Sequence, residues 1–126
     1  MNLAQYLDST YLKTAEQASI SFDQTKQNVI SLIEEAIENN FKLVMIRPEF
    51  VSLAYKLIQD ANSHVLVGTV IGFHQGTNSI EDKLNEASQA INNNIDELDF
   101  VVNYNAFLNG QVNLVKSEIY KGTKLA

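Results

Sequence analysis

The chain has 126 residues, 45% of them hydrophobic, and its fifteen acidic groups against nine lysines and arginines give a net charge of −6 at pH 7. This length and balance are typical of one globular domain with an apolar core. The acidic surface argues against nucleic acid or an anionic membrane as partner. The sequence holds no cysteine, which excludes disulfides, thiolate catalysis and cysteine-type zinc sites. With no signal peptide and no apolar run of spanning length, we expect a soluble cytoplasmic protein.

Strand and helix periodicities alternate along the chain. Compact apolar runs predict strands near residues 6–8, 43–47, 65–71 and 97–103. Apolar residues at helical spacing predict helices over 22–41, 49–61, 79–93 and from 112 onward. Ser21 or Asp23 is the expected N-cap of the first helix, and Ser79 opens the third. The expected buried stripes of the last two helices are Leu84, Ala87, Ala90 and Ile91, and Val115, Ile119 and Leu125.

This alternation predicts βαβ units and a parallel sheet, which is an α/β fold. About four units are present, whereas a complete (β/α)8 barrel needs eight units and about 250 residues. We therefore expect residues 1–126 to form a single partial TIM-barrel domain, the N-terminal half of such a barrel. The last helix has no glycine or asparagine cap before Ala126, so we expect a truncated chain.

Four segments carry a resemblance to a known family, and they are YLDSTYLK (6–13), LVMIRP (43–48), VGTVIGF with GTN close behind (67–78) and DELDFVVN (96–103). Their order and spacing resemble the first four strands of deoxyribose-phosphate aldolase. The resemblance implies a class I Schiff-base cleavage of 2-deoxy-D-ribose 5-phosphate to D-glyceraldehyde 3-phosphate and acetaldehyde, with no metal or other cofactor. It also implies a Schiff-base lysine on the sixth strand and a phosphate site in later loops, so this chain is expected to be inactive alone.

Asp99 is the candidate catalytic residue. Strand alternation places it with Glu97 on the face opposite Leu98 and Phe100, and the apolar face suits the helix layer. Asp99 then points into the barrel, where a carboxylate needs cations or hydrogen-bond donors around it. The resemblance implies a part in proton transfer beside two lysines. The alternative is an inward acid that only hydrogen-bonds neighbouring strands.

Three further residues are candidates for substrate binding. Asp8 is expected to end the first strand and to point into the same pocket, or else to make turn bonds with the Ser9–Thr10 backbone. Thr10 and Thr69 are predicted pocket hydroxyls.

The remaining polar residues are interpreted as structural. Lys13 and Lys83 are expected to be surface lysines, because neither is placed to enter a barrel interior. The loop over residues 72–78 has the position of a phosphate cradle, but a structural loop at the pocket rim is the favoured interpretation. His74 and His64 have no partner at triad or metal spacing and are expected at the surface.

Two functions remain open. The first is the aldolase, acting on a sugar phosphate. The second is a non-catalytic half-barrel module that pairs its open sheet edges with another copy or with a missing C-terminal half. In either case we expect the truncated chain to self-associate, because open edges and uncovered apolar side chains favour association.

Overall fold

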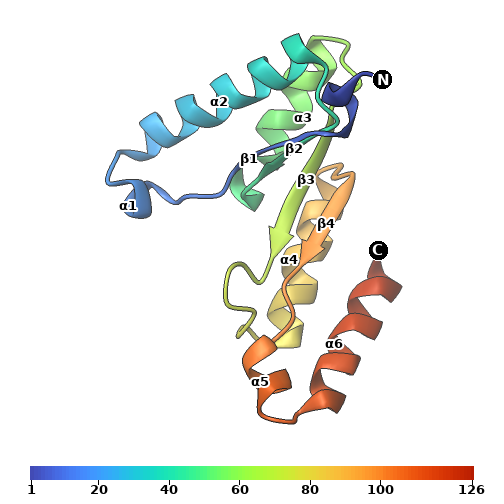
Figure 1. The fold of residues 1–126 in the computed structure, drawn as a ribbon. Helices are drawn as coiled ribbons and strands as arrows, with labels where there is room; N and C mark the ends of the chain where they lie inside the picture. Colours follow the sequence, from blue (N-terminus) through green and yellow to red (C-terminus); the bar gives the residue numbers. More distant parts are fainter.

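A computed structural model describes all 126 residues. Four parallel strands form one sheet in the order β1-β2-β3-β4, and the strands are β1 (Asp8–Tyr11), β2 (Leu43–Ile46), β3 (Leu66–Ile71) and β4 (Glu97–Phe100) (Figure 1). All four predicted strands are present. The first begins at Asp8, where it was expected to end, so Asp8 lies at the amino end of β1. The fourth ends at Phe100, because the chain beyond it turns to open a helix.

Helices connect the strands and follow the last one. They are η1 (Leu3–Tyr6), α1 (Ala15–Ala18), α2 (Phe22–Asn39), η2 (Pro48–Phe50), α3 (Val51–Asp60), α4 (Ile80–Asn92), α5 (Tyr104–Leu108) and α6 (Val112–Leu125). Ser21 caps α2, accepting a bond from Gln24 N in a reciprocal capping box. Ser79 caps α4 by accepting from Asp82 N. Local side-chain chemistry thus starts both long helices where the sequence predicted. None of the helices has the length and apolar character that a membrane span requires.

The main core lies between α2, α3 and the outer side of β2 and β3. Eleven buried residues form it, and they are Val29, Ile33, Ala36, Val44, Ile46, Phe50, Val51, Ala54, Ile58, Val65 and Val67. Both helices place these residues at spacings of three and four, which keeps one apolar stripe against the sheet. No charged group enters this cluster.

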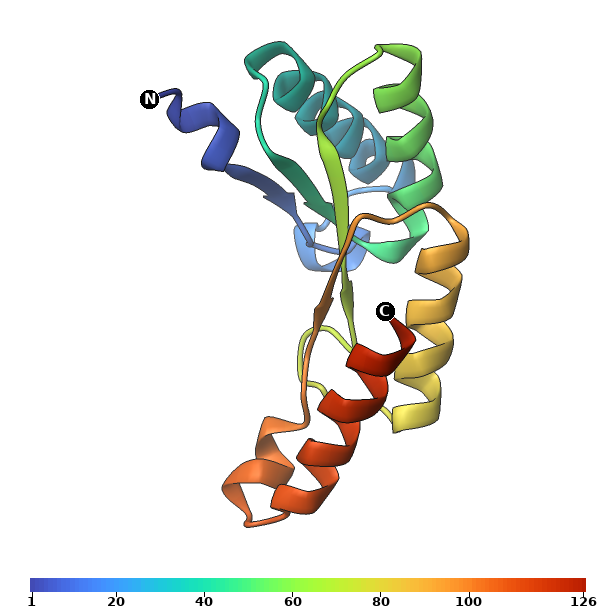
Figure 2. The same ribbon diagram turned by 90° about the vertical axis from the view of Figure 1, so that its right-hand side faces the viewer.

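A second helix layer covers β4. In Figures 1 and 2, α2 and α3 lie beside one end of the sheet, and α4 and α6 lie beside the other. Ala87, Ala90 and Val115 are buried here, as predicted. Ile91, Ile119 and Leu125 were expected to be buried but are 39%, 51% and 39% exposed. Ile119 borders an open hollow between α6 and β4, where Leu98 and Phe100 also lie, so the gap leaves it accessible. These three predictions of burial are wrong.

Candidate functional site

The face of the sheet opposite α2 and α3, here called the inner face, carries the candidate site. Strand register aligns Thr10, Met45, Gly68 and Glu97 in one row across all four strands. A Cβ atom added to Gly68 would lie 2.7 Å from the Met45 Cε atom, which confirms that both point the same way. The inner face therefore consists of Asp8, Thr10, Leu43, Met45, Leu66, Gly68, Val70, Glu97 and Asp99.

Carboxylates gather on the β4 side of the inner face. Burial, the negative charges of Asp99 and Asp8, and a hydrogen bond with the Asp99 side chain raise the pKa of Glu97, while the charge of Lys42 opposes the rise. Asp99 itself is exposed and stands in register with Val70, one row closer to the carboxyl end of the sheet than Glu97. The alternation argument thus placed Asp99 on the correct face. Its carboxylate is therefore accessible to a ligand that binds on this face.

Asp8 and Thr10 both lie on the inner face, on β1. Thr10 is exposed beside Met45, so its hydroxyl is accessible to a ligand. Asp8 pairs with Leu43 at the amino end of the sheet. The active sites of parallel barrels lie at the carboxyl ends of the strands. Asp8 therefore lies far from the expected active-site end, and it contributes negative charge at the amino end of the inner face.

Thr69 does not reach the inner face. It pairs with Ile46 and Leu98, whose side chains contact the helix layers, and it is fully buried. Its Oγ1 atom donates a 2.7 Å hydrogen bond to the Ile46 carbonyl oxygen. The structure therefore corrects the prediction that Thr69 is a pocket hydroxyl. Gly68 faces the inner side beside Met45, so its neighbour Thr69 faces the helices, which becomes evident only once the register of the sheet is known.

Lys83 is not a surface residue, contrary to the sequence interpretation. It is 0% exposed on α4, and its Nζ atom donates to Glu118 Oε1 at 2.7 Å. Glu118, on α6, is 3% exposed and accepts a second bond at 2.8 Å from the Asn103 backbone N–H. The pair lies on the helix side of β4, where Lys83 Nζ is 5.6 Å from the Phe100 ring centre. The missed signal was that Lys83 is four residues before Ala87 on the buried stripe.

The loop after β3 is fixed by its own bonds. Gly72 N donates to Glu86 Oε2 at 2.9 Å, so it is not free for a phosphate. Gly76 has a φ of 69°, and an added Cβ there would collide with the Val102 carbonyl oxygen. Only glycine fits this approach, which supports the interpretation of the segment as a structural loop.

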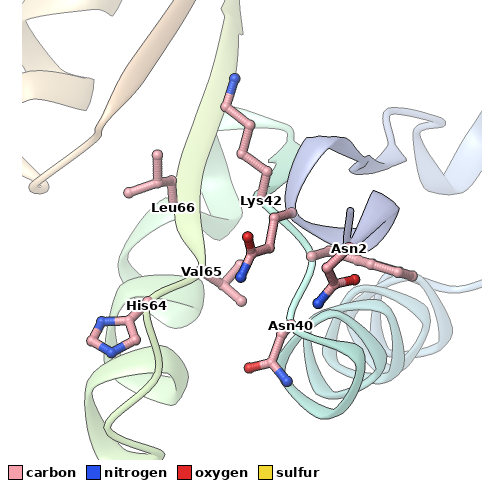
Figure 3. A pocket seen from close by; sticks show the side chains of 8 residues that line it. Asn2, Asn40, Lys42, His64, Val65 and Leu66 are labelled. Carbon is pink, nitrogen blue, oxygen red and sulfur yellow. The ribbon is translucent and has the colours of Figure 1, made fainter.

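Two hollows that hold a lysine and a histidine lie at opposite ends of the sheet. The amino-end hollow, of about 390 Å³, is shown in Figure 3, and its lining residues are Asn2, Gln5, Asn40, Phe41, Lys42, His64, Val65 and Leu66. The carboxyl-end hollow has about 330 Å³ and is lined by Leu12, Lys13, Gln17, Phe73 and His74. Both histidines are exposed, as predicted. No group of three or more histidine and carboxylate side chains is arranged to hold a metal ion.

Known proteins match this chain over nearly all of its length. No model of a protein family matches. The chain is 39% identical to the deoxyribose-phosphate aldolase of Caldanaerobacter subterraneus subsp. tengcongensis over 119 residues, which is 94% of this chain and 47% of that relative. A solved structure from Coccidioides immitis, assigned as a deoxyribose-phosphate aldolase, matches with a TM-score of 0.82 and 34% identity over 99% of this chain and 46% of that one.

A third match bears on assembly. The deoxyribose phosphate aldolase of Aeropyrum pernix, described as a unique tetrameric structure, matches with a TM-score of 0.65 and 27% identity over 92% of this chain and 48% of that one. The chain spans about half the length of the curated relatives it matches. It is a half-length chain similar to deoxyribose-phosphate aldolase, and the prediction of half of an α/β barrel is confirmed.

Proposed function

We propose that this half-length, aldolase-like chain forms the first half of a site that cleaves 2-deoxy-D-ribose 5-phosphate to D-glyceraldehyde 3-phosphate and acetaldehyde. One observation carries the proposal: Asp99 stands exposed on the inner face beside Glu97, a carboxyl whose pKa is raised by burial and by the charge of Asp99. The names of the relatives supply the reaction class. The finer assignments of residues to roles rest on the geometry of the inner face.

The proposed chemistry divides between the two halves of a barrel. A lysine amine from the other half condenses with the C1 aldehyde of the open-chain sugar, and water leaves. The positive iminium nitrogen then takes up the electron pair of the C2–C3 bond as that bond breaks. The C3 hydroxyl loses its proton as it becomes the new aldehyde. We assign Asp99 to this proton transfer, as a general base within hydrogen-bonding reach of the hydroxyl or of one intervening water. The enamine left on the lysine is then protonated at C2 and hydrolysed by water, which releases acetaldehyde and the free amine.

Thr10 is the proposed substrate contact from β1, and Asp8 has a more distant electrostatic role. The Thr10 hydroxyl, on the same face and closer to the carboxyl end of the sheet, is suited to bind a sugar hydroxyl. Asp8 acts at longer range, because its charge helps to raise the pKa of Glu97. Thr69 has no part in the proposal, since its hydroxyl is committed to Ile46.

The 126-residue chain by itself is proposed to be inactive. The amine that attacks an aldehyde must be unprotonated and accessible. Lys83 is the one buried lysine, but Glu118 holds it as an ion pair on the side of the sheet away from the inner face. The chain incubated with deoxyribose 5-phosphate and borohydride should therefore gain no covalent adduct. A stoichiometric adduct on one lysine would show that the chain carries its own Schiff-base residue.

A chimera tests the proposed function directly. Residues 1–126 would replace the matched part of the Caldanaerobacter relative, so that the remainder of that protein supplies the rest of a barrel. The expected result is a folded protein that cleaves deoxyribose 5-phosphate and forms a borohydride-trapped adduct in its second half. A chimera that folds cooperatively but neither cleaves the sugar nor forms an adduct would contradict the proposal.

A second function, a half-barrel that acts by association, is favoured by the exposed edges. β1 and β4 are the outer strands, and each leaves one row of backbone groups unpaired. Phe107, Leu108 and Tyr120 add apolar surface on α5 and α6, with exposures of 53%, 78% and 64%. The tetramer described for the Aeropyrum protein makes self-association plausible. Sedimentation at micromolar concentration should show species larger than one chain, and a single monomeric species with cooperative unfolding would exclude this function.

A further inference from the structure

The hollow between α6 and β4 is an apolar groove at one edge of the sheet. It has about 160 Å³, and its lining residues are Ala87, Leu98, Phe100, Val102, Ile119, Gly122, Thr123 and Ala126. Because β4 is an outer strand, one row of its backbone groups is unpaired beside this groove. The groove and the strand edge therefore form one uncovered surface.

One flank of α6 adds to this surface. The opposite flank faces α4, where Glu118 pairs with Lys83. Val112, Ile119 and Tyr120 lie two turns apart on the free flank, and they are 40%, 51% and 64% exposed. Beyond the contact with α5 at its start, α6 has no helix on this side in Figures 1 and 2. A helix could therefore pack here if a neighbouring strand were added to β4.

The other outer strand, β1, offers a matching surface. The Leu7 carbonyl oxygen accepts a hydrogen bond from Lys42 N, which extends the pairing of β1 by one residue. Alternation places Leu7 on the helix side of the sheet with Tyr11, and it is 50% exposed. On α2, Asn28 donates to the Tyr11 hydroxyl, so this flank of α2 lies toward β1. Glu35 follows Asn28 by two turns and lies on the same flank.

The uncovered ends of α2 and α6 carry opposite charge. Lys121 and Lys124 are exposed in the last five residues of α6, whose one carboxylate side chain, Glu118, is buried. Glu35 and Glu38 are exposed in the last five residues of α2. The two ion pairs of the chain involve none of these four exposed groups. All four are available to a partner of opposite charge.

We propose that two copies of this chain close one eight-stranded barrel, in which β1 of each copy pairs with β4 of the other and α2 of each packs on the free flank of α6 of the other. A two-fold axis along the strands generates this pairing, keeps all strands parallel and leaves no sheet edge open. Both helices begin after the carboxyl ends of their strands, so at each α2–α6 seam their oppositely charged ends meet. This pairing rests on the second function proposed above, the association of half-barrels.

Charge favours this pairing over the other ways in which two open sheets can meet. Pairing β4 with β4 would place the lysines of two α6 helices side by side, and pairing β1 with β1 would do the same with the glutamates of α2. The inner faces supply no attraction, because Asp8, Glu97 and Asp99 carry like charges. The seams between α2 and α6 therefore determine which edges pair.

The test reverses the charges of the two helices in separate chains. One chain carries Lys121→Glu with Lys124→Glu, and the other carries Glu35→Lys with Glu38→Lys. Each chain by itself has like charges at both seams and should dimerise about tenfold or more weakly than the unmodified chain. An equimolar mixture should dimerise like the unmodified chain, because both seams of the mixed dimer pair opposite charges again. Sedimentation equilibrium at constant ionic strength measures the dissociation constants.

A control and a second measurement accompany the charge reversal. Lys56→Glu alters an exposed lysine of α3, which lies at neither edge of the sheet, and should change the dissociation constant by about twofold or less. The sequence has no cysteine, so a short bis-maleimide can join chains carrying Glu35→Cys to chains carrying Lys124→Cys. Cross-linked dimers should form in the mixture and in neither chain by itself.

The outcomes separate this pairing from association in general. Association that does not respond to charge reversal, species larger than dimers, or cross-linking of either cysteine variant to itself would overturn the closed pairing and leave the second function in place. An unmodified chain that stays monomeric at micromolar concentration would overturn both.

Discussion

Two helix layers cover the sheet, one over β2 and β3 and the other over β4. The two layers are stabilised by different kinds of interaction. The first is an uncharged cluster of eleven apolar residues. The second contains small side chains such as Ala87 and Ala90 around the fully buried Lys83–Glu118 pair. The first layer is stabilised by the burial of apolar side chains, which tolerates different packing arrangements as long as the side chains fill the core. The second is sensitive to geometry, because burying two charges is unfavourable unless they meet each other and their other partners.

The layer that contains Lys83 and Glu118 also fixes the position of the chain that follows Asp99. Glu118 accepts from Lys83 Nζ and from the Asn103 backbone N–H, at 2.7 and 2.8 Å. Asn103 in turn caps α5, with its Oδ1 atom accepting from Ala106 N at 2.9 Å. One carboxylate thereby connects α4, α6 and the end of β4. Apolar packing holds the first layer in place, whereas this network sets where the strand with the candidate catalytic residue ends.

Removing one member of the buried pair should have the largest effect on stability. Lys83→Met leaves the Glu118 carboxylate buried without a counter-charge, which costs about 3–5 kcal/mol. Lys83→Met with Glu118→Gln should recover at least half of that loss, because the amide oxygen still accepts from Asn103 without a net charge. Urea unfolding measures both free energies. Lys116→Met, at an exposed lysine of α6, is the control and should change stability by no more than about 0.5 kcal/mol. A double variant as unstable as the single one would show that the charge pair is not the source of the loss.

A second pair of variants separates the two layers by their apolar residues. Ile33 is 0% exposed in the first layer, whereas Ile119, which helical periodicity predicted to be buried, is 51% exposed on α6. Ile33→Ala should lower the free energy of unfolding by about 2–5 kcal/mol, and Ile119→Ala by less than about 1 kcal/mol. Equal losses would mean that α6 buries Ile119 against a partner, as in a self-associated form. Repeating both measurements over a range of protein concentrations distinguishes these cases.

The two threonines test which face of the sheet each occupies. Thr69→Val removes the hydroxyl that donates to Ile46 and should cost about 1 kcal/mol of stability. Thr10→Val, on the exposed inner face, should leave stability unchanged and raise KM in the chimera described above. Thermal unfolding and steady-state kinetics on both variants give the comparison. Reversed outcomes would place Thr69 at the site and Thr10 in the fold.

The smallest expected effect is the pH dependence that Glu97 introduces. Its pKa is raised above the ordinary value of 4.5 by burial and by the charges of Asp99 and Asp8. The folded chain thus holds this proton more tightly than the unfolded chain, so the stabilisation is present at low pH and is lost as pH rises from 4.5 through the folded pKa. An NMR titration of the Glu97 carboxyl carbon should show a raised midpoint that falls in Asp99→Asn. A midpoint that does not move would exclude the coupling between these two carboxyls.

Local signals predicted most of the fold. Capping serines and long apolar stripes placed α2, α4 and the three later strands, because short-range chemistry decides those features. Alternation also placed Asp99 on the inner face. The predictions failed where a residue distant in sequence determines whether a side chain is buried. Lys83 is buried because Glu118, thirty-five residues later, meets it, and helical periodicity by itself treats a lysine as a solvent-facing residue.

The site was only partly predictable for a related reason. Thr69 has the residue type of a binding hydroxyl, but its face depends on register with Met45 and Gly68, which only the assembled sheet fixes. Asp8 was expected at the carboxyl end of β1 and lies at its amino end, because the strand begins two residues later than its apolar signal. Errors of one or two residues in a short strand are enough to move a side chain between faces or between ends.

The most direct test of the account is the turnover of the chimera with Asp99→Asn. Asparagine keeps the shape of the side chain and most of its hydrogen bonding, but it cannot accept a proton. The account predicts that kcat falls by about 10² or more, that the lysine adduct still forms with borohydride, and that the melting temperature is unchanged. A variant that unfolds while its folded fraction keeps full turnover would show that Asp99 is a structural residue and would contradict the proposed function of this half-barrel.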